Sequence, residues 1–313
     1  MQTPNFLIPG HGQSRSTARK PRRNNTYVRP VTPALIACIL AALLAAGLSA
    51  SSRWIAASEA RSLQPHWMRY SDGLPPGNAN TVFVDRDQTI WVGTNSGVER
   101  FDGRWQSLQT DEASPNGPIR AIAQTTDGVL WVGGDHGLAR IISDTPDGAP
   151  QVARVEALQG PIYALLATAG GLLWAATDAG AAVYDGTSWT ALPLYQASGL
   201  PARVLALAED SDGQVWAGGD TLHRIDVHSI QADLIDDVPF HSRVQALRVA
   251  PTRGRWSETL WVGTAGEGLW SYSDHWRHFG MPQPGQSAEG IASNNVLALG
   301  IDDDGNLWIG TSG

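Results

Sequence analysis

Lysine and cysteine, two residue types that many enzymes use in catalysis, are scarce in this chain. Lys20 is its only lysine and Cys38 its only cysteine. Lys20 lies in a basic N-terminal arm and Cys38 in an apolar run, so we expect neither a phosphate-binding lysine nor a disulfide framework. The sequence contains no H-E-x-x-H or G-x-S-x-G motif. We therefore expect no catalytic residue and no cofactor within this chain.

Two acidic segments have the carboxylate spacing that begins a calcium loop. These segments, residues 210–213 and 302–305, are not followed by the late glutamate that such a loop requires. The eight histidines are scattered, and we interpret His275 and His278 as a surface pair. The sequence therefore predicts plain hairpin turns at the two segments and no metal site.

Three arginines point to ligand binding instead. Arg120, Arg203 and Arg243 each stand at the start of a short apolar run. Because guanidinium groups hold planar carboxylates bidentately, they would suit an anionic ligand such as a uronate-bearing oligosaccharide or a carboxylate metabolite. That prediction requires that their charge is not neutralised internally. The acidic residues able to neutralise it follow a second apolar run in their repeat copies: Asp135, Asp178, Asp220 and Glu267.

The charge of the chain is divided unevenly. Residues 1–60 contain seven basic residues and one acid, whereas residues 61–313 contain 15 Arg against 29 Asp and Glu, a net charge of -14. Phosphate backbones would be repelled by such an acidic body. Nucleic acid is therefore excluded as a partner.

A repeat reveals the elements that must position these residues. Six copies of a Trp-hydrophobic-small phrase occur at intervals of 40, 43, 42, 45 and 47 residues: Trp91, Trp131, Trp174, Trp216, Trp261 and Trp308. Each copy contains about four short apolar runs separated by turns rich in Asp and Gly, without helical periodicity. Four-stranded units of this length are typical of β-propeller blades. We expect an all-β propeller in which the six tryptophans are mostly buried and fill the wedges between blades. The small residue two positions after each tryptophan is expected to let the neighbouring blade approach.

Each copy also marks where its innermost strand begins. A small residue opens the first apolar run of every copy: Thr81, Ala121, Ala164, Ala206, Ala246 and Ala298. The positions three and one before it vary, as expected if they face an open channel at the top of the propeller. The polar and aromatic residues among them are the candidate ligand-binding set: Asn78, Asn80, Arg120, Tyr163, Arg203, Arg243, Gln245 and Asn295. Solvated loop residues without a ligand are the alternative.

The two ends of the repeat predict how the ring closes. Residues 66–80 contain an outer-strand phrase followed by the loop into the first copy, so they are expected to close the last blade. The sixth copy stops after its second strand. We expect residues 66–313 to form a propeller that is incomplete at its C-terminus and seven-bladed when complete, in a longer natural product.

The N-terminal region predicts a membrane anchor. Residues 1–29 form a basic arm, residues 30–52 are uncharged and apolar, and residues 53–65 are a linker. An uncharged run of about 20 residues is a membrane span or a signal peptide, and a basic arm stays in the cytoplasm. We favour an uncleaved single-pass anchor in the cytoplasmic membrane, with the propeller in the periplasm or cell exterior.

The motif Asp-x-x-Gly-x-Leu-Trp-Ile-Gly-Thr-x-x-Gly resembles the two-component regulator propeller repeat. Residues 302–313 follow it position by position until the chain ends, and residues 85–105 follow it with Gln88 and Ile90 as departures. Copies two and four depart from it in their Gly-Gly-Asp triplets, and copy three has Ala176 in place of a glycine. The resemblance implies an extracytoplasmic sensor propeller of a membrane signalling protein. A histidine kinase or diguanylate cyclase output would lie beyond residue 313, and a homodimer would form through that output region.

Three functions remain open on the sequence. The favoured one is a sensor for a small-molecule or oligosaccharide ligand. The second is a protein-interaction scaffold on the cell surface. The third is a lyase-like propeller enzyme, to which His136, His241 and Glu267 could contribute, although no spacing unites them.

Overall fold

The structure is a computed structural model that describes residues 78–108, 117–142, 151–251, 258–282, 290–302 and 304–312. These residues form five four-stranded sheets and one two-stranded sheet, each strand antiparallel to the next. We call the sheets blades 1 to 6 in chain order. No helix occurs among the described residues. The predicted all-β architecture is confirmed.

Each blade runs from its innermost to its outermost strand. Blades 1 to 3 consist of β1 (Ala79–Val84), β2 (Ile90–Thr94), β3 (Gly97–Phe101) and β4 (Trp105–Ser107); β5 (Ile119–Gln124), β6 (Leu130–Gly134), β7 (Gly137–Ile142) and β8 (Gln151–Val155); and β9 (Ala164–Ala167), β10 (Leu173–Thr177), β11 (Gly180–Tyr184) and β12 (Trp189–Pro193). Blades 4 to 6 consist of β13 (Val204–Glu209), β14 (Val215–Gly219), β15 (Leu222–Asp226) and β16 (Gln231–Leu234); β17 (Val244–Pro251), β18 (Glu258–Thr264), β19 (Leu269–Tyr272) and β20 (Trp276–Phe279); and β21 (Val296–Ile301) and β22 (Leu307–Thr311).

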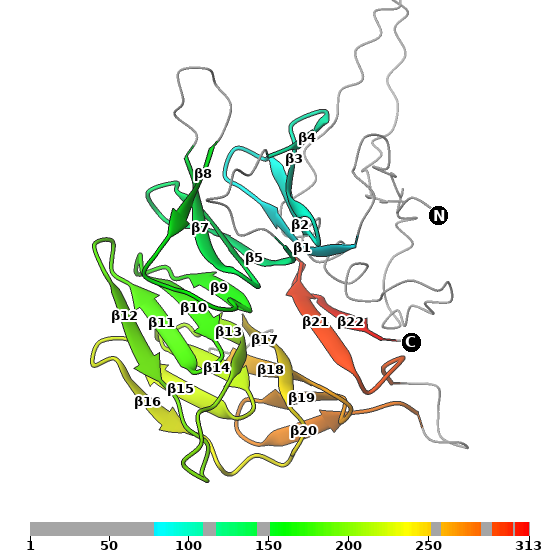
Figure 1. Ribbon diagram of the computed structural model, residues 1–313. Coiled ribbons are helices and arrows are strands. Elements are labelled where there is room, and N and C mark those ends of the chain that lie inside the picture. The colour runs from blue at the N-terminus through cyan, green and yellow to red at the C-terminus, as the bar shows by residue number, and fades with distance from the viewer. Residues whose placement is uncertain are drawn as a thin grey trace, which may run out of the picture.

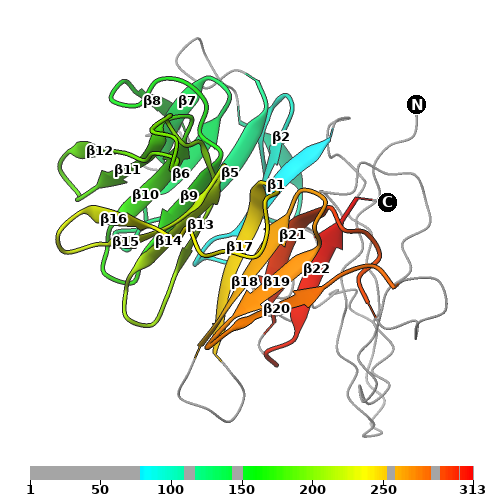
Figure 2. The same cartoon turned by 90° about the horizontal axis from the view of Figure 1, so that it is seen from below.

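The blades follow one another around a common centre. Their first strands, β1, β5, β9, β13, β17 and β21, lie nearest the centre, and each contacts the first strand of the next blade (Figure 1). The view at 90° shows β17–β20 lying beside β21 and β22 (Figure 2). This arrangement is that of a β-propeller, in which each sheet packs face to face on its neighbours.

The hairpin between the first two strands of a blade is held by the repeat tryptophan. In blade 1 the Asp85 carboxylate accepts the backbone N–H groups of Asp87 and Thr89, and its second oxygen accepts the Trp91 indole N–H at 2.8 Å. The same bond, between an acid and a tryptophan six residues later, joins Asp210 to Trp216 at 3.1 Å and Asp302 to Trp308 at 2.9 Å. This bond explains why the motif begins with aspartate. Residues 210–213 therefore form a hairpin turn, as the sequence predicts, and Gly305 N–H donates to the Asp302 carbonyl in the equivalent connection of blade 6.

Blades 2 and 3 replace this aspartate by threonine. Thr125 Oγ1 still accepts the Trp131 indole N–H at 3.1 Å. Thr168 Oγ1 instead exchanges hydrogen bonds with the backbone of Leu172. As a result the Trp174 Nε1 atom is buried without a partner.

The six tryptophans occupy equivalent places but are not equally buried. Each tryptophan pairs with the same position of its inner strand, two residues after the small residue that opens that strand. Trp91, Trp131 and Trp174 are buried and pack in clusters that join their blade to the next. Trp216, Trp261 and Trp308 are half-buried and none of the six is exposed, so burial decreases in the last three blades. The Trp216 ring is covered by the Arg224 guanidinium at 5.5 Å, and Trp308 has no described blade after it.

Glycine two residues after the tryptophan allows the next blade to approach. A Cβ on Gly218 would lie 2.5 Å from Val244 of blade 5, and one on Gly263 would lie 2.6 Å from Val296 of blade 6. Equivalent short approaches occur at Gly93 and Gly133. In each case the contacted residue begins, or directly precedes, the inner strand of the next blade. The prediction that a small residue lets the neighbouring blade approach is confirmed.

The expected N-terminal arm, apolar span and linker, and the start of the expected closing strand, lie outside the described residues. Among the described residues no helix is long and apolar enough to cross a membrane.

We expect Gly218→Ala to lower the free energy of unfolding by about 1–3 kcal/mol, because its new methyl group would overlap Val244. Gly170→Ala is the matched control, since its methyl group would meet only Thr168 Oγ1, at 3.9 Å. Denaturant unfolding of the two variants measures the difference. Equal midpoints would show that the blades do not need this close approach.

We expect Thr168→Asp to raise the free energy of unfolding by about 0.5–1.5 kcal/mol, because the carboxylate would supply the acceptor that Trp174 Nε1 lacks. The gain should vanish in a Trp174→Phe background, which has no indole N–H. A gain that persists there would mean that the aspartate acts through the turn alone.

Candidate functional site

The candidate residues lie on what we call the top face of the propeller. This face consists of the residues that lead into each innermost strand and the residues that follow each second strand. A backbone hydrogen bond joins the two parts in five blades: the N–H groups of Asn95, Asp135, Asp220, Ala265 and Ser312 bind the carbonyls of Asn78, Pro118, Arg203, Arg243 and Asn295. The top face therefore has the same backbone connection in these five blades, which differ in their side chains.

A β-bulge is repeated at the top of the inner strands. The pairing of the first two strands skips one residue in five blades, and these bulge residues are Asn80, Arg120, Leu205, Gln245 and Leu297. Tyr163 holds the same position directly before β9. A bulge bends the strand and re-aims the side chain of its extra residue. The position one before the small residue, identified from the sequence, is thus a distinct structural position, here called the bulge ring.

The arginines of the top face are paired with carboxylates. Arg243 Nε donates to Asp220 Oδ1 at 3.0 Å, and Arg203 Nε lies 3.1 Å from Asp178 Oδ1 as an ion pair without hydrogen-bond alignment. Both pairs reach from one blade back to the loop of the preceding blade. Arg120 instead pairs with Asp135 of its own blade, which raises the pKa of the guanidinium although burial opposes the shift.

Tyr163 joins these pairs into one network across blades 2 to 4. Its hydroxyl donates to Asp178 at 2.8 Å, and the guanidinium carbons of Arg120 and Arg203 lie 5.7 and 5.9 Å from its ring centre. Burial and the hydrogen bond to Asp178 raise the pKa of the Tyr163 hydroxyl. The Arg203 backbone N–H also donates to Asp220 at 3.1 Å. Because Asp220 pairs with Arg243, the network extends to blade 5.

The asparagines of blades 1 and 6 bond within their own blades. Asn80 donates to Asn95 at 2.8 Å, and Asn295 donates to Ser312 at 2.7 Å. Asn78 is exposed, and its carbonyl accepts the Asn95 N–H. Asn95 and Ser312 occupy the same position after the second strand as Asp135, Asp178 and Asp220 in other copies. Alignment of the repeats could therefore have identified them as candidate residues, whereas residue type alone did not.

Gln245 is the bulge residue of blade 5 and differs from the others. It is half-buried, and its Oε1 atom is buried without a hydrogen-bond partner. Its neighbours in the bulge ring, Leu205 and Leu297, are also half-buried. The sequence-based candidate set omitted these two leucines, although they hold the same position.

Glu267 does not neutralise an arginine. Its carboxylate accepts the backbone N–H of His241 and the hydroxyl of Ser242, and these hydrogen bonds lower its pKa against the opposing effect of burial. Each of the three arginines nevertheless has its own aspartate. The condition under which an anionic ligand was expected, unneutralised arginines, is therefore not met.

The residues considered for catalysis do not form a catalytic group. Glu267 and His241 meet in blade 5, but through the His241 backbone, whereas His136 follows β6 of blade 2. Among the described residues no group of three or more His, Cys, Asp or Glu side chains could hold a metal ion.

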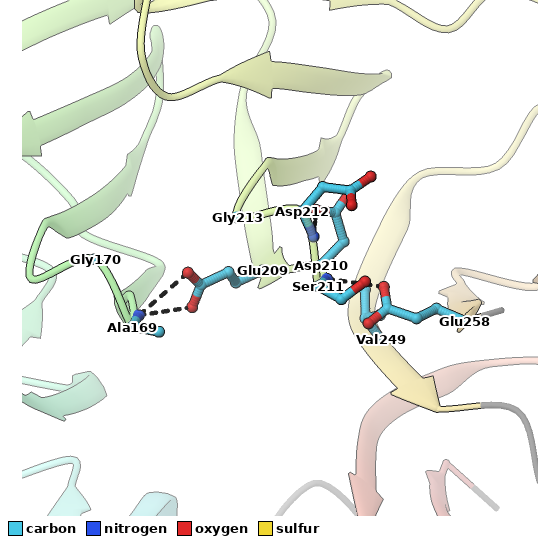
Figure 3. A pocket seen from close by; sticks show the side chains of 9 residues that line it. All are labelled: Ala169, Gly170, Glu209, Asp210, Ser211, Asp212, Gly213, Val249 and Glu258. Carbon is cyan, nitrogen blue, oxygen red and sulfur yellow. Dashed lines mark hydrogen bonds between the residues drawn. The ribbon is translucent and has the colours of Figure 1, made fainter. Parts of the chain in front are cut away.

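A shallow hollow of about 440 Å³ lies at the opposite, hairpin end of blades 3 to 5. Figure 3 shows its carboxylates binding backbone N–H groups of neighbouring hairpins: Glu209 accepts from Ala169, and Glu258 from Ser211 at 2.9 Å. Gln124 accepts from Arg86 of blade 1 in the same manner, at 3.0 Å. These side chains tie adjacent blades together, which explains their presence without a ligand.

The model of the two-component regulator propeller matches residues 73–96, 113–136, 198–221 and 290–313. Each match contains the first two strands of its blade. These segments are two-component regulator propeller repeats. They include copies two and four, whose Gly-Gly-Asp triplets depart from the motif, whereas the matched segments do not include copies three and five. No curated protein matches the chain in sequence.

Solved structures with the same fold include sensors, a secretion component and a lyase. The extracellular domain of the hybrid two component system BT3049 from B. thetaiotaomicron is 16% identical, with a TM-score of 0.61 over 79% of this chain and 35% of that one. PorZ, a surface component of the type-IX secretion system of Porphyromonas gingivalis, is 19% identical, with a TM-score of 0.61 over 79% and 40%. Virginiamycin B lyase from Staphylococcus aureus is 15% identical, with a TM-score of 0.59 over 80% and 82%. At these identities the likeness shows the fold alone, and this chain spans little more than a third of the extracellular domains of the two component systems.

We expect Arg203→Ala to change the free energy of unfolding by less than about 1 kcal/mol. The Arg203–Asp178 pair is partly exposed, and exposed ion pairs contribute little to stability. Chemical denaturation at low and at high salt checks this. A larger loss would show that the top-face network holds the blades together.

Proposed function

We propose that this propeller is the extracytoplasmic ligand-sensing part of a membrane-anchored bacterial signal-transduction protein. The observation that carries the proposal is the set of four regulator propeller repeats. The extracellular domains of hybrid two component systems that share its fold support it. The output domain, a histidine kinase or a diguanylate cyclase, is proposed to lie outside this chain.

The top face is the proposed ligand site. Its backbone hydrogen bond recurs in five blades, while its side chains differ from blade to blade. A site of this kind can acquire specificity for a small molecule or an oligosaccharide by side-chain variation on a common scaffold. The proposed contacts are the eight candidate residues named from the sequence.

The two alternatives have less support. Similarity to virginiamycin B lyase is one of fold. Of the candidate catalytic residues, His136 lies on blade 2, whereas His241 and Glu267 meet on blade 5 only through the His241 backbone. For a protein-interaction scaffold, the relevant observation is the exposure of Tyr195 and Leu200 on the connection between β12 and β13, at 53% and 61%. Two exposed apolar side chains are ordinary for a protein surface.

We expect a reporter fused after Ala60 to lie outside the cytoplasm. Alkaline phosphatase should be active at that point and β-galactosidase inactive, because the basic arm is retained in the cytoplasm. The opposite pattern would refute the proposed topology. The size of the fusion separates an anchor from a signal peptide, since cleavage near Ala50 would shorten the product by about fifty residues.

A further inference from the structure

The connection between blades 3 and 4 is a loop that closes on itself. Residues 194–202 join β12 to β13, and Leu194 and Ala202 are buried at the base of this loop. The Ala202 N–H donates to the Leu194 carbonyl at 2.8 Å, whereas the Tyr195 side chain between them is exposed. Arg203 of the top face follows the base directly. The closure of this loop therefore helps to fix where Arg203 begins.

His223 of β15 holds this loop from blade 4. The side chain is buried, its Nε2 atom lies 3.1 Å from the Tyr195 carbonyl oxygen, and its Nδ1 atom lies 3.3 Å from the Thr221 hydroxyl. A carbonyl oxygen only accepts hydrogen bonds, so Nε2 carries the proton and Nδ1 accepts from Thr221. The neutral ring therefore satisfies both partners and ties blade 4 to the loop that arrives from blade 3.

The position of His223 recurs in every complete blade. It lies in the third strand, opposite Ala217 in the middle of the second strand. The residues at the same position in the other four complete blades are Glu99, Ala139, Ala182 and Trp270. In blade 5 this residue, Trp270, packs against Phe240 of the connection from blade 4, with 5.9 Å between the ring centres. Of blades 2 to 5, only blade 4 has a side chain at this position whose charge changes near neutral pH.

A charge on His223 would have no counter-charge beside it. Its cross-strand neighbours in blade 4 are Ala217 and Leu234. Blade 3 packs on blade 4 with the face that carries Trp174, and the residues of that face in β10, β11 and β12 are not ionisable. The described ionisable groups along the same interface have other partners: Glu209 binds the Ala169 N–H, Arg203 and Tyr163 pair with Asp178, and Asp220 pairs with Arg243.

The closed loop therefore favours the neutral ring. Burial lowers the pKa of His223 below its ordinary value of 6.5, and the hydrogen bond to Tyr195 opposes this shift. In an open loop the ring would reach water and take up a proton at its ordinary pKa. Closure is thus fully favoured above pH 6.5 and is weakened as the pH falls below 6.5, because the open form then binds more protons than the closed form.

We infer that His223 is an acid-sensitive latch on residues 194–202. At neutral pH its Nε2–H holds the Tyr195 carbonyl and keeps the loop closed. In mildly acidic solution a proton on Nδ1 takes the place of the hydrogen bond from Thr221, and the buried charge is relieved when the loop opens. Because Arg203 follows this loop, opening loosens one of the blades that build the top face. The latch goes beyond the proposed ligand site, since it responds to pH without a ligand.

Amide hydrogen exchange of the full chain in detergent micelles tests the latch. Exchange is followed by mass spectrometry about one unit above and about one unit below pH 6.5, and each rate is corrected for the pH dependence of a free amide. We expect residues 194–202 to lose protection by up to about 10-fold on the acidic side, the factor that one pH unit gives for a single proton.

The connection between β8 and β9 is the internal control. In residues 156–163 the N–H groups of Ile162 and Tyr163 are also hydrogen-bonded to backbone carbonyls, but Ala182 stands at the position of His223. Its corrected exchange should not change with pH.

The variant His223→Gln isolates the titration, because glutamine keeps an N–H donor for the Tyr195 carbonyl and takes up no proton. Residues 194–202 should then be equally protected on both sides of pH 6.5. His228→Gln makes the same change at a histidine whose side chain is 83% exposed and should keep the acid response. If His223→Gln does not fold, His223→Phe serves instead, since it keeps a buried ring that cannot be protonated.

Two results would overturn the inference: an equal acid response of the two connections in the wild-type chain, or an acid response that persists when His223 is replaced. No ligand is added in these measurements, and the reporter fusions do not depend on them. A failed latch therefore leaves the proposed sensing function and topology untouched.

Discussion

The close approach of neighbouring blades is the constraint on which the rest of the structure depends. A glycine in the second strand lies against the residue that leads the next inner strand, at Gly93, Gly133, Gly218 and Gly263. The tryptophan two residues earlier packs in the cluster between the same two blades. Together they set the spacing of the sheets. The residue that follows the second strand is then placed beside the start of an inner strand, and the top face is built from that pairing.

The two ends of each blade use polar side chains for different purposes. At the hairpin end, three aspartates each accept a hydrogen bond from a tryptophan indole N–H: Asp85, Asp210 and Asp302. Glu209 and Glu258 accept hydrogen bonds from backbone N–H groups in the hairpins of adjacent blades. These groups are fully engaged in holding the fold. At the top face a backbone hydrogen bond recurs in five blades, and the side chains differ from blade to blade. This variation supports the proposal that a ligand binds there.

The charges of the three top-face arginines are neutralised by neighbouring carboxylates. Arg120, Arg203 and Arg243 stand in a strongly acidic body and each takes one aspartate. Because each guanidinium has a carboxylate partner, the three arginines give no support to an anionic ligand.

The sequence by itself determined the repeat, the strand order within each blade, the role of the small residues and the positions that vary, because each depends on local spacing. It could not determine which arginine meets which carboxylate. Arg203 and Arg243, three residues before the small residue, reach back to the preceding blade, whereas Arg120, the bulge residue, binds within its own blade. The unequal burial of the tryptophans and the unpaired Gln245 oxygen were likewise decided only by the tertiary structure. Both depend on which residues of the neighbouring blade pack against these side chains, and a local sequence pattern does not specify those residues.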